Sequence, residues 1–313
     1  MQTKTNSALS RPLVVMLLAS LCCLLWGSAI PFINLGYRYF EIGGSDTATQ
    51  ILFGGCRFLM AGMLTILFES IAQKKIALPK RTSWGNVVKL SLAQTIIQYV
   101  FFYIGVAHTV SAKSAIIQGL QAFTSILVAC FVFRSEKMNK LKWIGGLIGV
   151  AGIVVVNWTK DGFAGGMSFI GEGFVIVSML ASACSTGLIK KFGAYDSPVV
   201  MSGWQFMLGG AVMMIVGLLS GGRLRASNML AYAVLFYLAM LSAVAYSIWA
   251  VLLRVNPVSR VAVYTFLQPI FGVFLSLTLV DRGSEAPLLR YAAALVMICV
   301  SIAVVNRGQR QEG

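Results

Sequence analysis

The chain has 313 residues, of which 58% are apolar and only 11% are charged, and its formal net charge is +15. A soluble domain has about 25% charged residues, so this composition excludes a soluble globular enzyme. It also excludes a disordered chain, which is poor in apolar residues. The apolar residues form long runs rather than the short alternating segments of a membrane β-barrel. The predicted fold class is therefore an all-α integral membrane protein.

Hydropathy along the chain predicts ten membrane-spanning helices. A helix needs about 20 mostly apolar residues to cross the hydrocarbon core of a bilayer. In chain order, the segments that meet this requirement are 13–35, 47–69, 86–107, 111–133, 142–158, 168–189, 199–220, 230–253, 260–280 and 288–305. The connections between them are short, and none is long enough to fold alone. The first segment lacks a convincing small-residue cleavage site, so we expect it to remain as a signal anchor.

Lys and Arg residues are concentrated in alternate loops. The two termini and the loops on their side of the membrane hold most of the 25 basic residues. Because basic loops face the cytoplasm, both termini are predicted to be cytoplasmic, in the cell inner (plasma) membrane. An even number of spans agrees with this orientation. The net charge is then mostly a matter of topology, so the expected partners are the lipid bilayer and a small-molecule substrate, and not a nucleic acid.

Two parts of the sequence resemble each other. Residues 111–157 align with residues 258–306, so that Leu120-Gln121 matches Leu267-Gln268 and Glu136 matches Asp281. The aligned spans are the fourth and fifth against the ninth and tenth, which gives a repeat unit of five helices. An odd unit places the two copies in opposite orientations across the membrane. The prediction is two inverted five-helix repeats, 1–158 and 159–313, a plan common in transporters that bind substrate near the midplane.

Four short motifs stand in positions typical of a known family. They are Leu25-Trp26-Gly27-Ser28 in the first span, Cys56-Arg57-Phe58 in the second, Phe133-Arg134-Ser135-Glu136-Lys137 after the fourth and Leu267-Gln268-Pro269 in the ninth. In order and spacing they resemble the EamA-like branch of the drug/metabolite transporter (DMT) superfamily, although Ala122 stands where that family has Pro and Asp281 where it has Glu. The resemblance covers nearly the whole chain. It implies a ten-helix fold with a central cavity and small-molecule transport, often export.

Polar and aromatic side chains inside the spans indicate where a cavity lies, because polar groups are costly in a bilayer. The first, third, fourth, sixth, eighth and ninth spans carry such stripes, whereas the fifth and tenth are nearly all apolar and are predicted to be scaffold. The candidate substrate-binding residues are Gln98, Tyr99, Gln121, Tyr246, Trp249, Tyr264 and Gln268, with Gln121 and Gln268 ranked first because they occupy matching places in the two repeats. The alternative is that these side chains join helices by hydrogen bonds, as Ser and Gln do in membrane proteins.

Arg57 is the one charged residue near the centre of a predicted span, with no Asp or Glu at similar depth. It could hydrogen-bond helix carbonyls freed near Pro31 or Gln side chains, or it could meet a substrate carboxylate or phosphate. We favour a structural role and retain Arg57 as a candidate substrate contact. Pro31 and Pro269 each remove a backbone donor, and both are expected to interrupt or kink their helices.

Several chemical signatures are missing from the sequence. The six cysteines have no metal-ligand spacing, there is no phosphate-binding glycine loop, and the spans hold no acid or histidine cluster for catalysis or proton coupling. The chain is therefore predicted to be no enzyme and to need no cofactor or metal. The predicted function is a secondary transporter, an exporter of an amino acid or related amphipathic compound working by alternating access. The alternatives are a structural or receptor-like membrane protein and an importer or exchanger of another solute.

Overall fold

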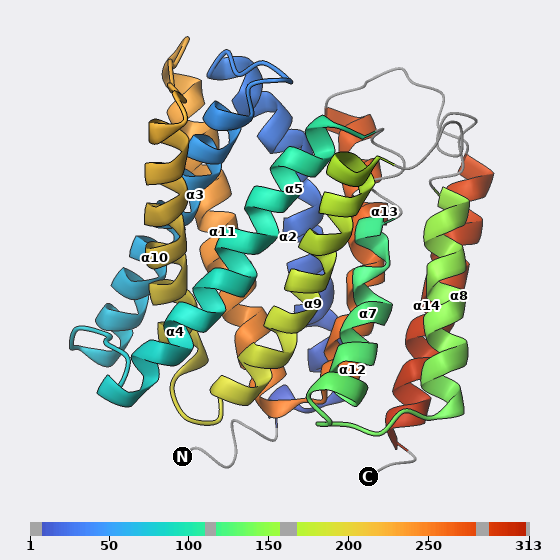
Figure 1. The fold of residues 1–313 in the computed structure, drawn as a ribbon. Coiled ribbons are helices and arrows are strands. Elements are labelled where there is room, and N and C mark those ends of the chain that lie inside the picture. The colour runs from blue at the N-terminus through green and yellow to red at the C-terminus, as the bar shows by residue number, and fades with distance from the viewer. Residues whose placement is uncertain (1–7, 110–116, 157–167, 280–287, 311–313) are drawn as a thin grey trace.

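The computed structural model describes residues 8–109, 117–156, 168–279 and 288–310, and all the regular elements within these ranges are helical (Figure 1). Most of the predicted segments correspond to one helix, which we call a rod. The third segment is a rod of three helical pieces end to end, and the fourth is a rod of two. The elements of the first half are α2 (Pro12–Tyr39), α3 (Thr47–Gln73), η1 (Arg81–Ser83), α4 (Trp84–Ser91), η2 (Leu92–Ile97), α5 (Gln98–Ala107), α7 (Gln121–Leu127), η3 (Val128–Val132) and α8 (Lys140–Val156).

The second half continues in the same way, with one composite rod at its start and another near its end. Its elements are η4 (Phe169–Gly173), α9 (Phe174–Phe192), α10 (Pro198–Leu219), α11 (Met229–Val255), α12 (Val258–Ala262), η5 (Val263–Phe266), α13 (Leu267–Leu279) and α14 (Leu288–Arg310). Each of the ten predicted segments falls on a helical run. The first few residues of the fourth segment, the aligned Asp281 and the end of the fifth segment lie outside the described residues.

Within the described ranges, seven helical stretches are long and apolar enough to cross a membrane. They are Pro12–Tyr39, Thr47–Gln73, Arg81–Val106, Phe169–Phe192, Pro198–Leu219, Met229–Val255 and Ala292–Gln309, and a shorter apolar helix covers Ile117–Val132. Their outer faces expose large apolar side chains one turn apart, such as Leu13 and Leu17 on α2 and Leu67 and Ile71 on α3. Exposed apolar stripes of this kind face lipid rather than water. The count of ten membrane crossings stays a prediction.

Polar residues begin several of these helices. The side chain of Asp46 accepts a hydrogen bond from Thr49 N at the start of α3 (3.0 Å), and Asn228 accepts one from Ala231 N at the start of α11 (3.3 Å). Each bond satisfies one of the backbone donors that a helix leaves free in its first turn. Ser197 begins α10 in the same way.

Pro31 does not interrupt its helix, because α2 continues through it without a break. The reason is that hydrocarbon offers the backbone no partner other than the helix itself, so the remaining hydrogen bonds hold the helix together. Before Pro269 the α-helix gives way to a 3-10 turn, which covers Val263–Phe266. That turn is consistent with the donor that Pro269 lacks.

The helices form a bundle with a tight pair at each flank (Figure 1). The pair α3–α10 lies on one side and the pair α8–α14 on the other, with the remaining rods between them. We call the end at which α2 begins and α14 ends, the lower end in Figure 1, the basal end. The loops predicted to be rich in Lys and Arg, which follow α3, η3, α9 and α11, all lie at this end.

Glycines permit the closest helix contacts. A Cβ atom at Gly210 of α10 would lie 2.3 Å from the backbone nitrogen of Leu59 on α3, closer than real contacts allow. Gly145 plays the same part in the α8–α14 pair, where its carbonyl accepts a hydrogen bond from Ser301 Oγ (2.7 Å). The structure thus places the fifth and tenth predicted segments side by side, and their role as scaffold stays a prediction.

Helices of the two halves of the chain pack against each other. α2 lies against α11 and α13 of the second half, and α9 lies against α5 and α7 of the first half. At Gly27 of α2 the approach to α13 is close, since a Cβ atom there would lie 2.8 Å from Gly272 N. The central rods are therefore shared between both halves of the chain.

Candidate functional site

Arg57 on α3 is buried inside the bundle, with 2% of its surface exposed. Its Nε donates a hydrogen bond to Ser242 Oγ on α11 (3.1 Å), and Ser242 Oγ in turn donates to the carbonyl of Leu238 (2.9 Å). The guanidinium carbon lies 5.1 Å from the centre of the Phe58 ring, within the range of a cation–π contact. Arg57 therefore connects α3 with α11, through Ser242 rather than through the carbonyls near Pro31 or the Gln side chains considered in the sequence.

Tyrosine side chains gather around this guanidinium group. The hydroxyl groups of Tyr99 and Tyr103 on α5 and of Tyr246 on α11 all lie within electrostatic range of Arg57. The hydroxyls of Tyr99 and Tyr246 share a hydrogen bond of 2.7 Å. The ring of Tyr103 occupies the space that a side chain at Gly54 would fill, so a residue without Cβ on α3 gives this ring its place.

Further aromatic rings extend the group toward α2. The Trp26 ring lies 5.0 Å from the ring centres of both Tyr246 and Trp249. On the opposite side of Tyr246, the Phe206 ring of α10 lies at 4.9 Å. Gln98, next to Tyr99 on α5, also interacts with Tyr246. We call the six residues Trp26, Arg57, Gln98, Tyr99, Tyr103 and Tyr246 the Arg57 cluster.

Three polar atoms of the Arg57 cluster are buried without a hydrogen-bond partner in the described part of the chain. They are Trp26 Nε1, Gln98 Oε1 and Tyr103 Oη. Buried polar groups in proteins are nearly always hydrogen-bonded, so each exception needs a reason. Two of the three atoms are donors or can donate, and one is an acceptor. Unsatisfied groups of both kinds beside a buried cation are typical of a site that binds a polar ligand.

The predicted site residues separate into three groups. Arg57, Gln98, Tyr99 and Tyr246 lie together, and Trp249 joins them through Trp26. Trp26 was not among the predicted site residues. The signal that could have found it is its place in the Leu25-Trp26-Gly27-Ser28 motif of the first span.

Tyr264 lies apart from this group, toward the basal end. Its backbone carbonyl accepts a hydrogen bond from Cys23 Sγ (3.2 Å), and its hydroxyl accepts one from Asn306 Nδ2 near the end of α14 (3.4 Å). Gln121 on α7 and Gln268 on α13 are half-buried, and no hydrogen bond joins either side chain to another described residue. Their role as substrate contacts stays a prediction.

The alternative of hydrogen-bonded helix contacts applies to Gln94, one turn before Gln98. Gln94 Oε1 accepts a hydrogen bond from Gln205 Nε2 on α10 (3.0 Å), and Gln205 Oε1 accepts one from Thr95 Oγ1 (2.7 Å). All three residues are buried. One polar stripe of the third rod thus serves two purposes, with Gln94 holding α10 and Gln98 facing the Arg57 cluster.

A second polar group, the basal network, joins the two halves at the basal end. Glu136, in the loop after η3, pairs with the fully buried Lys142 of α8 at 3.3 Å. Its carboxylate also accepts hydrogen bonds from Ser259 N at the start of α12 (3.1 Å), from Ser259 Oγ, and from Gln309 Nε2 at the end of α14 (2.9 Å). We define the basal network as Glu136, Lys142, Ser259 and Gln309.

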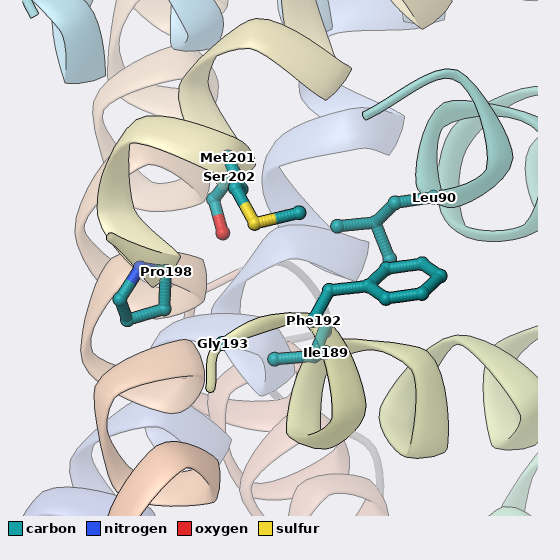
Figure 2. Close-up of a pocket in the computed structure, with 7 residues that line it drawn as sticks. All are labelled: Leu90, Ile189, Phe192, Gly193, Pro198, Met201 and Ser202. Carbon is teal, nitrogen blue, oxygen red and sulfur yellow. The ribbon is translucent and has the colours of Figure 1, made fainter. Parts of the chain in front are cut away.

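The hollow drawn in Figure 2 is a crevice between α4, α9 and α10 near the basal end. Its lining is mostly apolar and consists of Leu90, Ile189, Phe192, Gly193, Pro198, Met201 and Ser202. The crevice is too narrow to hold a water molecule, and it contains none of the predicted site residues. It is therefore a packing defect rather than a substrate site.

The model of the EamA-like transporter family matches residues 13–158 and 169–307, in two consecutive stretches. The chain belongs to the EamA-like transporter family. The resemblance predicted from the four motifs is thereby confirmed, and the protein is a multi-pass membrane protein of a transporter family.

Several relatives are similar to this EamA-like protein along most of their length. The uncharacterized transporter YvbV of Bacillus subtilis is 24% identical over 294 residues, covering 93% of this chain and 90% of YvbV. The uncharacterized inner membrane transporter YedA of Escherichia coli is 26% identical over 285 residues, covering 89% of each chain. A solved crystal structure with 16% identity superimposes with a TM-score of 0.75 over 95% of this chain and 98% of the other, which establishes the fold.

Among the described residues of this EamA-like protein, no group of three or more His, Cys, Asp or Glu side chains could hold a metal ion. The buried acid Glu172, at the start of the sixth rod, accepts hydrogen bonds from Thr109 Oγ1 (2.8 Å) and Ser168 N (2.7 Å). The bond from Thr109 ties η4 to the residues that follow α5. Among the described residues, the Arg57 cluster is the group that combines a buried cation with several unpartnered polar atoms.

Proposed function

We propose that this EamA-like protein is a secondary transporter that exports a small amphipathic metabolite, an amino acid or a related compound, across the inner membrane. In this proposal ten spans form two inverted five-helix repeats, 1–158 and 159–313, and both termini are cytoplasmic. The two repeats move relative to each other so that a central site opens to one side of the membrane at a time. The protein then acts as a carrier and not as an enzyme.

The Arg57 cluster is the observation that carries this proposal. Its residues come from α2, α3 and α5 in the first half and from α11 in the second half. A site shared between two repeats changes its surroundings when the repeats move, which is what alternating access requires. The unpartnered buried atoms Trp26 Nε1, Gln98 Oε1 and Tyr103 Oη offer hydrogen bonds to a ligand.

The packing of the helices supports the repeat arrangement. In an inverted pair of five-helix units, the second and seventh rods are counterparts, and so are the fifth and tenth. α3 packs against α10 and α8 packs against α14, so each flank of the bundle joins two counterparts. The exchange of neighbours between α2 and α9 follows the same relation.

The basal network holds the two proposed repeats together at the basal end. Glu136 and Lys142 belong to the first repeat, whereas Ser259 and Gln309 belong to the second. Opening of the basal end requires these two groups to separate. With the termini in the cytoplasm, the arrangement corresponds to a carrier whose cytoplasmic end is closed.

Comparative metabolite profiling tests the proposed function. Cells that produce the wild type, a Tyr99→Phe/Tyr246→Phe variant or no carrier are compared, with membrane levels matched, and medium and cytosol are analysed by mass spectrometry. A Leu219→Ala variant is the control, because Leu219 is 84% exposed on the outer surface. We expect a compound enriched in the medium of the wild type and the control, and less enriched for the variant.

The alternatives predict different results from the same experiment. A compound enriched in the cytosol of the wild type identifies an importer. Equal profiles for the wild type and for cells without the carrier, under both export and uptake conditions, would refute transport and favour a structural or receptor-like protein.

A further inference from the structure

We infer that Arg57 is the counter-charge for a substrate carboxylate, so that the site takes a small monocarboxylate with a flat apolar body. This inference rests on the proposed function and specifies the substrate class of the same site. It assigns to Arg57 a binding role in addition to its contact with Ser242.

The charge of Arg57 points to a missing anion. Arg57 is 2% exposed, its hydrogen bond to Ser242 Oγ uses one of its five N–H donors, and the Tyr103 hydroxyl lies close to the guanidinium group. Within the described ranges no carboxylate forms an ion pair with it. A hydroxyl group and the face of Phe58 lower the cost of burying the cation, but neither carries a negative charge. Buried charges in proteins are normally paired, so a missing anion is expected to arrive with the ligand.

The Arg57 cluster also offers a set of donors. Trp26 Nε1 and Tyr103 Oη are buried and form no hydrogen bond of normal geometry with the described residues, and Tyr103 Oη lies close to the Arg57 guanidinium group. Together with the guanidinium group, they form a set of donors for a carboxylate, which is an acceptor with about four lone-pair sites. Gln98 Oε1 is the one unpartnered acceptor in the cluster. It suits an N–H or O–H group elsewhere on the same ligand.

The aromatic rings of the cluster indicate the shape of the rest of the ligand. The rings of Trp26, Tyr99 and Tyr246 surround the polar atoms with apolar surface, and aromatic rings pack well against a flat apolar body. A phosphate carries about two charges and calls for more than one cation. The buried Lys142 is already paired with Glu136 at the basal end, so Arg57 is the buried cation left for the site among the residues that the structure describes. One cation among rings fits a monocarboxylate and disfavours a phosphorylated or cationic substrate.

Binding of matched acids and amides tests this inference directly. The probes are phenylacetate, indole-3-acetate and phenylalanine, each compared with its own amide, and they are titrated into purified protein in lipid nanodiscs with tryptophan fluorescence as the signal. Hydrogen bonds to charged groups are about twice as strong as neutral ones. We therefore expect at least one acid to bind about 10-fold to 100-fold more tightly than its amide.

Variants show whether Arg57 causes this preference. Arg57→Gln is expected to make acid and amide bind equally, and Arg57→Lys to keep part of the preference because it keeps the charge. Tyr103→Phe, which removes only the hydroxyl group, is expected to weaken acid binding by about 5-fold. Gln205→Ala is the control, since it removes buried hydrogen bonds between α10 and the third rod without changing the charge at the site.

Three results would overturn the inference. They are equal binding of acids and amides to the wild type, an acid preference that survives in folded Arg57→Gln protein, and no binding of any acid probe. The metabolite profiling described above separates this failure from failure of the proposed function. Export of a neutral or cationic compound leaves transport intact and rejects the carboxylate, whereas acid binding without any transport retains the site and rejects the carrier.

Discussion

Replacing Glu136 by Gln is expected to destabilise the protein strongly, because it leaves a buried cation without its counter-charge. The Lys142 side chain is 0% exposed and that of Glu136 is 7% exposed, and the two are 3.3 Å apart. Breaking a buried ion pair by removing one partner costs about 3–5 kcal/mol. Lys142 Nζ keeps its hydrogen bond to the Lys137 carbonyl, and Gln still offers an acceptor to Ser259, so we expect the lower end, about 3 kcal/mol.

Thermal unfolding in detergent, followed by tryptophan fluorescence, measures this effect. The double variant Glu136→Gln/Lys142→Met removes both charges and is expected to regain most of the lost stability, because replacing a whole buried pair is often neutral. Lys137→Gln is the control, as its side chain is exposed in the same loop and its loss is expected to change stability by less than about 0.5 kcal/mol. The reasoning is refuted if Glu136→Gln unfolds at the wild-type temperature. It is also refuted if the double variant unfolds at the same temperature as Glu136→Gln or below it.

Further predictions concern the packing, the site and the topology. Gly210→Ala places a Cβ atom 2.3 Å from the backbone of α3 and should lower the folded yield on size-exclusion chromatography, whereas Gly85→Ala, with nothing within 4 Å, should not; equal yields would contradict the close contact. Ser242→Ala removes the described hydrogen-bond partner of a buried charge, so we expect a loss of about 1–3 kcal/mol in thermal unfolding, and unchanged stability would contradict the bridge between α3 and α11. Single cysteines at Lys74 and Arg223 should react differently with an impermeant maleimide added to intact cells, with labelling at position 223 alone; labelling at position 74 alone would reverse the proposed orientation.

Helix positions were predictable from the sequence because the membrane imposes one requirement on every span. Backbone groups in hydrocarbon must bond within the helix, so an apolar run of sufficient length has few alternatives, and predicted segment 230–253 became Met229–Val255. The same requirement explains why α2 is not interrupted at Pro31. One missing donor is a small loss for α2 when no other structure is available to the chain; whether the proline kinks the helix stays a prediction.

The site was predictable in composition but not in grouping. Gln94 and Gln98 lie one turn apart and look equivalent in the sequence, yet Gln94 bonds to Gln205, 111 positions away. Likewise, the partner of Arg57 is 185 positions away in the chain. Such pairings depend on which helices become neighbours, and a single sequence does not contain that information. The separation of Tyr264 from the Arg57 cluster has the same origin.

Among the described residues, the buried cations Arg57 and Lys142 are held in opposite ways, and the contrast bears on their roles. Lys142 has a permanent partner, since Glu136 belongs to the same chain and its carboxylate is further fixed by Ser259 and Gln309. Arg57 has a hydroxyl group and aromatic rings around it, and no ion pair among the described residues. A charge that is fully paired within the chain stabilises one arrangement of the helices. A charge whose counter-ion must come from a ligand leaves the protein less stable when empty than when loaded, and a carrier can use that difference to make its motion depend on substrate.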